Sequence, residues 1–320
     1  MPLPEKALIA RIRRQARGEG NLVAGIGDDC AVLRLPAGNE ALVTTDFSLE
    51  GIHFRRDWHP AESVGHRCLT RGLSDIAAMG GEPIAAFLSL ALPRQLPQAW
   101  VDGFVRGLLQ LATRAGVKLA GGDTAESPGG VVADIVVLGS VPKGKAILRS
   151  GAKPGDRIYV SGELGSSAAA VAEMMKHPKR KLNPRHFPGH FFPEARLALG
   201  RMLREKGLAS AMIDTSDGLS TDLAHLCQES GVGAELAAVA IPAAWIGKPA
   251  REVDERFVLH GGEDYELLFT VPTGKRVPAE LAGVRLTEIG VVMRGKKIFV
   301  RNAKGVGYEL VAQGWEHFPG

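Results

Sequence analysis

The sequence has 320 residues, of which 45% are hydrophobic and 23% are charged, and this balance excludes a wholly disordered chain. The net charge of +4 is small and aromatic residues make up only 6%, so we expect no nucleic-acid partner. The longest apolar stretch, residues 84–92, is too short to cross a membrane, and the first residues lack the apolar core of a signal peptide. Three scattered cysteines (Cys30, Cys68 and Cys227) favour a reducing compartment, so we expect a cytoplasmic protein.

The first half of the chain alternates helical and extended patterns. Residues 63–79 have helical spacing and end at a pair of glycines, and residues 97–115 carry an apolar stripe of the same period. Residues 84–92 form a short continuous apolar run, which is typical of a buried strand. The complete prediction for this half is helices at 5–16, 63–79 and 97–115, with strands at 31–35, 41–47, 84–92, 117–120 and 131–141.

Residues 142–156 are rich in Lys, Gly and Pro and break both periodicities, so we expect the boundary between two domains there, with domains at 1–148 and 149–320. For the second half we predict strands at 157–161, 211–214 and 266–271, and helices at 166–175, 193–206 and 219–230. Each half mixes strands with helices that cover one sheet face, which indicates an α/β or α+β architecture. The basic run at 176–185 is either a solvated loop or a flap that attracts phosphate.

Six short motifs place carboxylates among glycines and small hydroxyl residues. Such sites offer oxygen ligands and a backbone that can approach closely, as a hard divalent cation requires. The motifs are GIGDDCAV (25–32), TTDFSLEGIHF (44–54), GLSDIAAMGG (72–81), AGGDTAES (120–127), DTSDGLSTD (214–222) and HGGEDYELLF (260–269).

Bringing these acids together requires cations. Two carboxylates about 4 Å apart repel by roughly 4 kcal/mol at an effective dielectric constant near 20. Mg²⁺ usually completes its coordination shell with water and phosphate oxygens, so many Asp residues without Cys or His partners indicate phosphate chemistry. The sequence contains no GxxxxGK[ST] loop, no GxGxxG opening a βα unit and no kinase HRD and DFG pair. If ATP is used, it is bound in a different way from that of P-loop proteins or protein kinases.

Each acid also has a simpler reading. A single Asp in a glycine turn is usually an Asx cap, and Thr44, Thr45 or Ser216 are equally compatible with plain strand or cap hydroxyls. Asp75 fits this reading poorly, because it lies in an otherwise apolar helical segment. The pair at Asp214 and Asp217 follows a buried-looking strand and precedes a helix, where nucleotide phosphates often bind.

In this order and spacing, the motifs GIGDD, TTD, SDIAAMGG, GGD, DTSDGLS and GGEDYELLF resemble those of the bacterial thiamine-monophosphate kinase family. The resemblance runs from Gly25 to the C-terminal GWEHF and so covers nearly the whole chain. It implies a two-domain PurM-like architecture: an N-terminal domain whose mixed sheet pairs with a second subunit to form a barrel, and a C-terminal α+β domain. It also implies a homodimer that uses ATP and Mg²⁺ to convert thiamine monophosphate to thiamine diphosphate by direct in-line transfer, the last step of thiamine diphosphate synthesis.

The same resemblance assigns roles to individual residues. The implied catalytic residues are Asp75, Asp123, Asp217 and Arg149. The implied metal ligands are Asp29, Thr45, Asp46, Asp75, Asp123, Asp214 and Asp217. The implied ATP contacts are Gly122, Asp123, Arg149 and Ser216, and the implied thiamine pocket consists of His53, Glu263 and Trp315.

Two other hypotheses remain at this point. The chain is also compatible with another ATP-using member of the superfamily, such as an aminoimidazole ribonucleotide synthetase, because fold alone does not fix the substrate. Selenophosphate synthetases and hydrogenase-maturation proteins carry a reactive Cys near one end of the chain, which this sequence lacks. The second hypothesis, from a different class, is a nucleotide- or metal-binding module without turnover. For His53 and Trp315 the simpler readings are a strand-end histidine and a core anchor.

Overall fold

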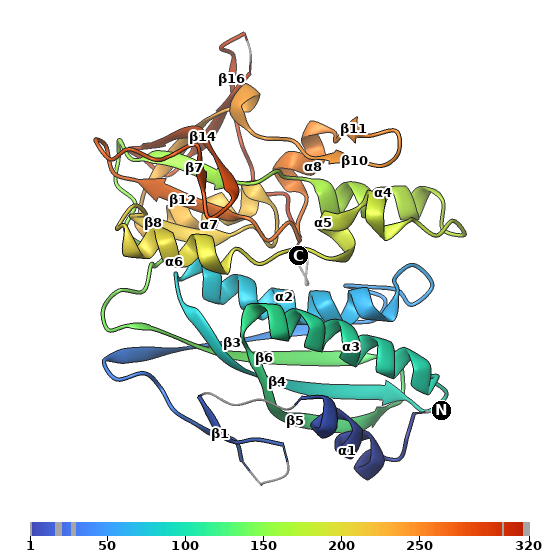
Figure 1. Ribbon diagram of the computed structural model, residues 1–320. Helices are drawn as coiled ribbons and strands as arrows, with labels where there is room; N and C mark the ends of the chain where they lie inside the picture. Colours follow the sequence, from blue (N-terminus) through green and yellow to red (C-terminus); the bar gives the residue numbers. More distant parts are fainter. Residues whose placement is uncertain (1, 17–20, 27–29, 303, 316–320) are drawn as a thin grey trace. The chain divides into compact units, whose positions relative to one another are not determined.

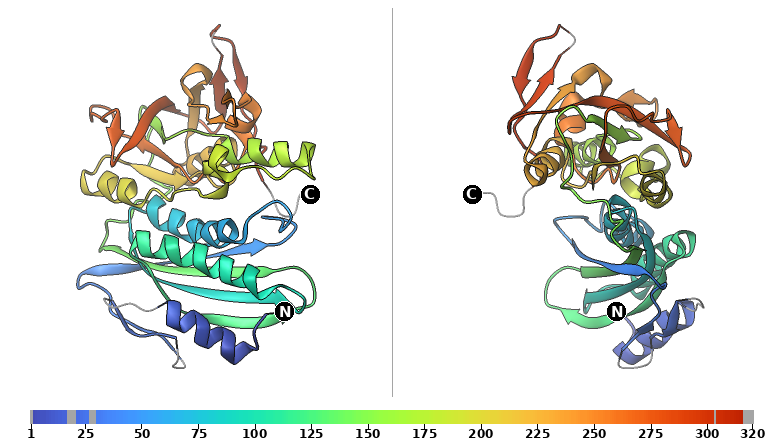
Figure 2. Two further views of the ribbon diagram at one scale, coloured as in Figure 1. Left: turned by 45° about the vertical axis from the view of Figure 1, so that its right-hand side comes forward. Right: turned by 90° about the vertical axis from the view of Figure 1, so that its left-hand side faces the viewer.

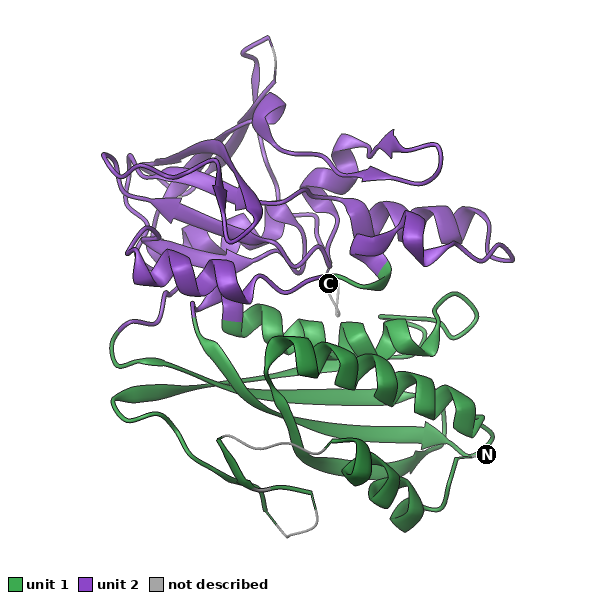
Figure 3. Cartoon of the chain, in the orientation of Figure 1, with its two compact units in different colours: residues 1–76, 81–144, 191–193 green, residues 77–80, 145–190, 194–320 purple. Residues whose placement is uncertain are grey.

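The computed structural model describes residues 2–16, 21–26, 30–302 and 304–315. The chain forms two units (Figure 3). Unit 1 comprises residues 1–76, 81–144 and 191–193, and unit 2 comprises residues 77–80, 145–190 and 194–320. No helix in the described part of the chain is long and apolar enough to cross a membrane.

Unit 1 is built on a four-stranded sheet with the strand order β3-β6-β4-β5 (Figure 1). Its strands are β3 (Asn39–Leu49), β4 (Glu82–Pro93), β5 (Lys118–Ser127) and β6 (Val132–Pro142). Only the β4–β5 pair in this sheet is parallel. Helices α2 (Ala61–Ala78) and α3 (Gln98–Ala115) cover one face of the sheet (Figures 1 and 2).

The two faces of this sheet differ in burial, as the period of two along a strand requires. On β6, Ala133, Ile135 and Val137 are fully buried against the helices. On β3, Val43 is 67% exposed and Phe47 is 58% exposed. We call the first side the covered face and the second side the open face.

Near β5, unit 1 adds helix α1 (Glu5–Gln15) and the short pair β1 (Leu22–Ala24) and β2 (Val32–Leu33). Helix α1 buries Leu8 and Ile12 and contacts β5. The prediction of a strand at 117–120 was too short, because β5 stays paired with β4 as far as Ser127. The GGD motif therefore lies within a strand and not in a turn.

Unit 2 contains a larger, mostly antiparallel sheet with the strand order β16-β15-β9-β14-β7-β12-β8, to which β13 adds by pairing with β14. Its strands are β7 (Arg157–Ser161), β8 (Ala211–Asp214), β9 (Gly233–Ala237), β12 (Leu267–Val271), β13 (Glu280–Leu281), β14 (Val284–Met293), β15 (Ile298–Arg301) and β16 (Gly307–Glu309). A separate hairpin pairs β10 (Trp245–Ile246) with β11 (Arg251–Glu252).

The helices of unit 2 are α4 (Ser166–Lys176), α5 (Pro188–Phe191), α6 (Leu197–Glu205), α7 (Leu219–Ser230) and α8 (Glu255–His260), with 3-10 turns at Pro184–His186 and Ala238–Ala240. Leu199 and Leu203 of α6 pack in one core cluster with Met212 and Phe269. The helix predicted from residue 193 begins only at Leu197, because Arg196 has non-helical backbone angles and directs its side chain to Glu266. The strands β9, β14 and β15 were not predicted.

Candidate functional site

On the covered face of unit 1, Asp75 projects from α2 toward β3. Its Oδ2 accepts a hydrogen bond from the Thr44 hydroxyl. Asp46 lies two residues further along β3 and therefore on the same face as Thr44. Both carboxylates are partly buried. The structure thus brings together two of the expected metal ligands, and it adds Thr44, for which the sequence had left a plain strand hydroxyl as the simpler reading.

Thr45 belongs to the other face. Its hydroxyl donates to Asp134 Oδ1 at 2.7 Å. Asp134 is paired across the sheet with Ser89, which is paired in turn with Asp123. Strands lie about 4.8 Å apart, so Asp123 and Asp134 are separated by roughly 10 Å in one row of the open face. The role of Thr45 as a metal ligand stays a prediction. Asp134 was not predicted, because its alternating strand pattern gave no sign of a functional role.

Gly122 allows the β5 backbone to approach β4 very closely. Its φ is 142°, and a Cβ atom there would lie 1.8 Å from the carbonyl oxygen of Leu88. Beside Gly122 and Asp123, a cavity of about 590 Å³ opens within unit 1. Its walls come mainly from apolar residues of α1, β4 and β5, together with residues 25–26 and 30–31 of the GIGDDCAV motif. The expected ligand Asp29 lies outside the described residues.

His53 lies in the turn that follows β3. Its Nδ1 accepts a hydrogen bond of 2.9 Å from the backbone N–H of Leu49. Because Nδ1 is the acceptor, the proton of the neutral imidazole is on Nε2. The ring can therefore donate from Nε2 to an anionic group. Its role in substrate binding stays a prediction.

In unit 2, the DTSDG loop (residues 214–218) and the GGEDY loop (residues 261–265) pair through their backbones. The N–H of Glu263 donates to Ser216 O at 2.8 Å, and the N–H of Tyr265 donates to Thr215 O at 3.0 Å. Glu263 and Tyr265 have φ values of 65° and 54°, a left-handed conformation that is uncommon outside glycine. Such conformations persist where the surrounding structure enforces them and are frequent at functional sites. The loop pairing therefore places the expected residues Ser216 and Glu263 side by side.

Three carboxylates surround the start of α7. Asp214 ends β8 and is 3% exposed, and Asp217 is partly buried in the loop that follows. Asp222 lies in the first turn of α7, where its Oδ2 accepts hydrogen bonds from the N–H groups of Asp217 (3.2 Å) and Gly218 (3.0 Å). Burial raises the pKa of Asp222 well above its usual value, and the charges of Asp214 and Asp217 raise it further. A cation would relieve the repulsion within this group. Asp222 was not predicted as a site residue, because an acid in a first helical turn is ordinary.

The C-terminal segment contacts the same loop. Trp315 donates its backbone N–H to Asp217 O at 3.2 Å, and Gly314 donates to the Thr221 hydroxyl at 3.0 Å. The side chain of Trp315 is half-exposed. Unit 2 therefore brings together five expected site residues from three separate segments, namely Asp214, Ser216, Asp217, Glu263 and Trp315.

Arg149 lies elsewhere in unit 2. Its carbonyl oxygen accepts a hydrogen bond from the Ser230 hydroxyl, at the C-terminal end of α7. Helix α7 has 12 residues, which corresponds to about 18 Å. The main chain of Arg149 is thus at the opposite end of this helix from the DTSDG loop, and its expected contact with ATP stays a prediction.

Within the described ranges, no three His, Cys, Asp or Glu side chains are grouped so that they could hold a metal ion by themselves. Mg²⁺ does not need such a group, because one or two carboxylates together with phosphate and water usually suffice.

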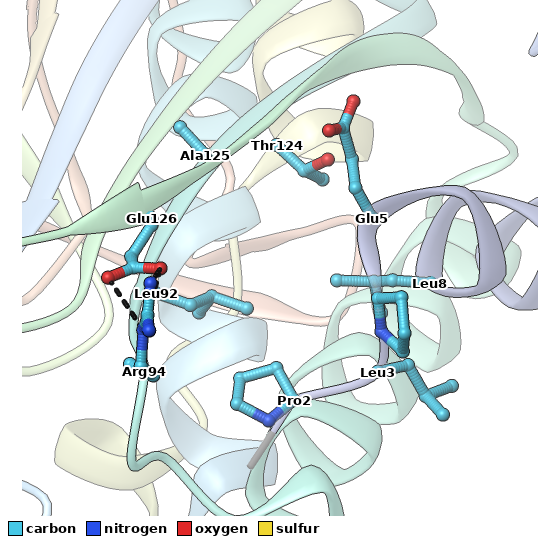
Figure 4. Close-up of a pocket in the computed structure, with 10 residues that line it drawn as sticks. Pro2, Leu3, Glu5, Leu8, Leu92, Arg94, Thr124, Ala125 and Glu126 are labelled. Carbon is cyan, nitrogen blue, oxygen red and sulfur yellow. Dashed lines mark hydrogen bonds and ion pairs between the residues drawn. The ribbon is translucent and has the colours of Figure 1, made fainter.

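Burial raises the pKa of the Cys68 thiol to about 12, so this thiol is not a nucleophile. A second cavity of about 420 Å³, beside the ion pair of Arg94 and Glu126, contains none of the expected residues (Figure 4).

The family model for the N-terminal domain of AIR synthase related protein matches residues 27–141, and that for its C-terminal domain matches residues 153–302. The thiamine-monophosphate kinase of Salmonella typhimurium is 38% identical over 333 residues, covering 99% of this chain and 99% of the relative.

Two solved structures are also similar to the chain. The thiamine-monophosphate kinase from Stenotrophomonas maltophilia K279a has a TM-score of 0.81 and 34% identity, covering 94% of this chain and 97% of that chain. The structure of AaThiL complexed with AMPPCP and TMP has a TM-score of 0.77 and 31% identity, with 99% of each chain covered.

Proposed function

The chain belongs to the thiamine-monophosphate kinase family, and from this premise we propose that it transfers the γ-phosphoryl group of ATP to thiamine monophosphate. The products are thiamine diphosphate and ADP. The observation that carries this proposal is the similarity over nearly the full length of both chains to AaThiL, which was solved in complex with AMPPCP and TMP. A match of this extent to relatives with one activity favours a kinase over a purine enzyme or a binding module without turnover.

The donor set suits magnesium. Carboxylate oxygens are the protein ligands that Mg²⁺ prefers, and unit 2 places the buried Asp214 and Asp222 near the partly buried Asp217. When bound, Mg²⁺ neutralises phosphate charge and polarises the phosphoryl oxygens. The residues that we propose to hold it are Asp29, Thr45, Asp46, Asp75, Asp123, Asp214 and Asp217.

The remaining residues bind and orient the two anionic substrates. The backbone at Gly122 and the hydroxyl of Ser216 contact ATP, and the guanidinium of Arg149 offsets charge that develops during transfer. His53, Glu263 and Trp315 bind the thiamine phosphate. His53 donates from Nε2 to the phosphate, which the hydrogen bond from Leu49 to Nδ1 supports. The acceptor phosphate oxygen is already a nucleophile, so the transfer requires alignment of the two phosphates and no strong general base.

We also propose that the protein is a homodimer that pairs through the open face of the unit 1 sheet. The exposure of Val43 and Phe47 on β3 supports this proposal, because a solvated sheet face normally carries polar side chains. Light scattering of the purified protein should give twice the chain mass of 34.0 kDa. Phe47→Asp should shift the measured mass toward that of a single chain.

The activity is tested by incubating the purified protein with ATP, MgCl₂ and thiamine monophosphate and separating the products by chromatography. We expect thiamine diphosphate and ADP in equal amounts, and no product when EDTA removes the metal. ATP hydrolysis without thiamine diphosphate, or no reaction at all with Mg²⁺ present, contradicts the proposed function.

A further inference from the structure

The first turn of α7 connects the site segments of unit 2. Three successive side chains there contact the site segments, and Ser220 also accepts the backbone N–H of Gln313 at 3.4 Å. Ser220 Oγ lies 2.8 Å from Nδ1 of His260, just before the GGEDY loop. Thr221 Oγ1 accepts the backbone N–H of Gly314, and Asp222 accepts the N–H groups in the DTSDG loop. This turn therefore organises the segments that carry the proposed ligands of both substrates.

The contact with the C-terminal segment is unusually close. A Cβ atom on Gly314 would lie 2.0 Å from Asp217 O and 2.5 Å from Thr221 Oγ1. Glycine thus lets the backbone lie directly on the DTSDG loop and within hydrogen-bond distance of the Thr221 hydroxyl. The next residue, Trp315, then donates its own N–H to Asp217 O at 3.2 Å.

Residues 311–315 have no regular secondary structure, so few backbone bonds fix their position. The Thr221 hydroxyl accepts the hydrogen bond of the Gly314 N–H. In a strand or helix, a backbone carbonyl oxygen would take this role. Trp315 follows Gly314 directly, so a shift of the Gly314 backbone also moves the backbone of Trp315.

We propose that Thr221 is a positioning residue for the substrate site: its hydroxyl, together with the close approach of Gly314, holds Trp315 against the DTSDG loop. This inference rests on the proposed function, in which Trp315 packs on the thiamine phosphate. Thr221 itself touches neither substrate. Loss of its hydroxyl should therefore weaken binding of the thiamine substrate while leaving ATP binding and the transfer step nearly unchanged.

The kinetic test compares Thr221→Val, which keeps the shape but removes the acceptor, with Thr221→Ser, which keeps the hydroxyl. We expect Thr221→Val to raise KM for thiamine monophosphate about tenfold, with kcat and KM for ATP within about twofold of the unaltered protein. Thr221→Ser should restore the original KM. Gly314→Ala should act like Thr221→Val, because its Cβ would displace the segment from the loop.

Two control variants match these changes in chemistry. Thr113→Val removes a hydroxyl that bonds only within α3, and Gly129→Ala adds a Cβ atom where nothing lies within 4 Å. Both should keep all three kinetic constants. Equal KM values for thiamine monophosphate in Thr221→Val, Thr221→Ser and the unaltered protein overturn the inference.

A second readout does not depend on catalysis. Fluorescence of Trp315 is obtained by subtracting the spectrum of Trp315→Phe, made in each background. Iodide should quench this signal more strongly in Thr221→Val and Gly314→Ala than in Thr221→Ser. Unchanged quenching overturns the inference even if the protein makes thiamine diphosphate. Absence of product in the unaltered protein overturns the proposed function instead, and the quenching comparison still decides whether Thr221 places Trp315.

Discussion

The two units position their carboxylates in different ways. In unit 1, Asp46, Asp75 and Asp123 lie on strands and a helix, so the register of regular elements decides which face each one occupies. In unit 2, Asp214 and Asp217 lie at a strand end and in a loop, and backbone bonds between loops distant in sequence fix them. Unit 1 thus relies on local periodicity, and unit 2 relies on long-range contacts with close glycine approaches.

The largest expected effect tests whether both kinds of position serve one reaction. Each Asp→Asn change at 75, 123, 214 or 217 should lower kcat/KM at least about 100-fold, because it removes a charge that we propose binds the metal. Initial rates of thiamine diphosphate formation over a range of Mg²⁺ concentrations measure this. Asp102→Asn, which removes the ion pair with Arg11 and alters a hydrogen bond from Gln98, is the control. If the variants of one unit keep full activity, the carboxylates of that unit do not bind the metal, and only those of the other unit can do so.

The next largest effect is on the free energy of unfolding. It compares a buried ion pair in unit 2 with a surface ion pair in unit 1. Glu266 is 4% exposed and receives a two-pronged contact from Arg196, with Nε–Oε2 at 2.7 Å. Arg196→Met leaves that carboxylate buried without its charged partner, although the Ser161 hydroxyl still donates to it, and should destabilise unit 2 by about 3 kcal/mol. Arg106→Met breaks a surface pair with Glu62 in unit 1 and should cost less than about 1 kcal/mol. Urea unfolding curves measure the loss of stability in both variants. Equal losses would contradict the expected difference between the buried and the surface ion pair.

A smaller effect appears in the pH dependence of unit 2. Burial raises the pKa of Asp264 to about 7, although the N–H groups of Gly165 and Ser167 lower it. The folded state therefore binds this proton more tightly than the unfolded state does. The stability from this group is fully present below about pH 4 and is lost as the pH rises through about 7, with roughly 2 kcal/mol of the loss between pH 5 and pH 8.

Asp264→Asn cannot titrate, so it should remove that part of the pH dependence. Comparing urea midpoints of the variant and the unaltered protein at pH 5 and pH 8 isolates the contribution. If the variant instead loses as much stability between pH 5 and pH 8 as the unaltered protein does, Asp264 does not hold its proton in the folded state.

The smallest expected effect separates the two faces of β3. Thr44→Val removes the hydroxyl that holds Asp75 and should raise the Mg²⁺ concentration for half-maximal rate about tenfold. Thr45→Val removes the bond to Asp134 on the open face and should raise it only about threefold. If Thr45→Val has the larger effect, the open face contributes more to metal binding than the covered face does, and the expected order is reversed.

The sequence was most informative where a pattern repeats along one element. The helical stripe at 97–115 and the apolar run at 84–92 predicted α3 and β4, because the burial of one face imposes a period that the residues display. Asp75 stood out for the same reason, as a charge inside such a pattern.

Contacts between segments distant in sequence could not be predicted. Three features depend on loops that meet only in the folded unit. They are the pairing of Ser216 with Glu263, the burial of Asp222 and the close contact of Gly314 with Asp217. The separation of Thr44 from Thr45 required the strand register, since adjacent strand residues point to opposite faces. Strand β14 was missed because charges and a glycine interrupt its apolar residues, and β15 was missed because it has only four residues.

The most direct test of the central claim is a crystal structure with Mn²⁺ in place of Mg²⁺, the ATP analogue AMPPCP and thiamine monophosphate. Anomalous scattering distinguishes Mn²⁺ from the lighter atoms of the protein and the nucleotide. The proposed function predicts Mn²⁺ peaks at about 2.1 Å from carboxylate oxygens of residues in the expected set, and also bonded to phosphate oxygens of the analogue. The proposed function would be contradicted by a structure in which the nucleotide is bound but the Mn²⁺ ions contact none of Asp75, Asp123, Asp214 and Asp217.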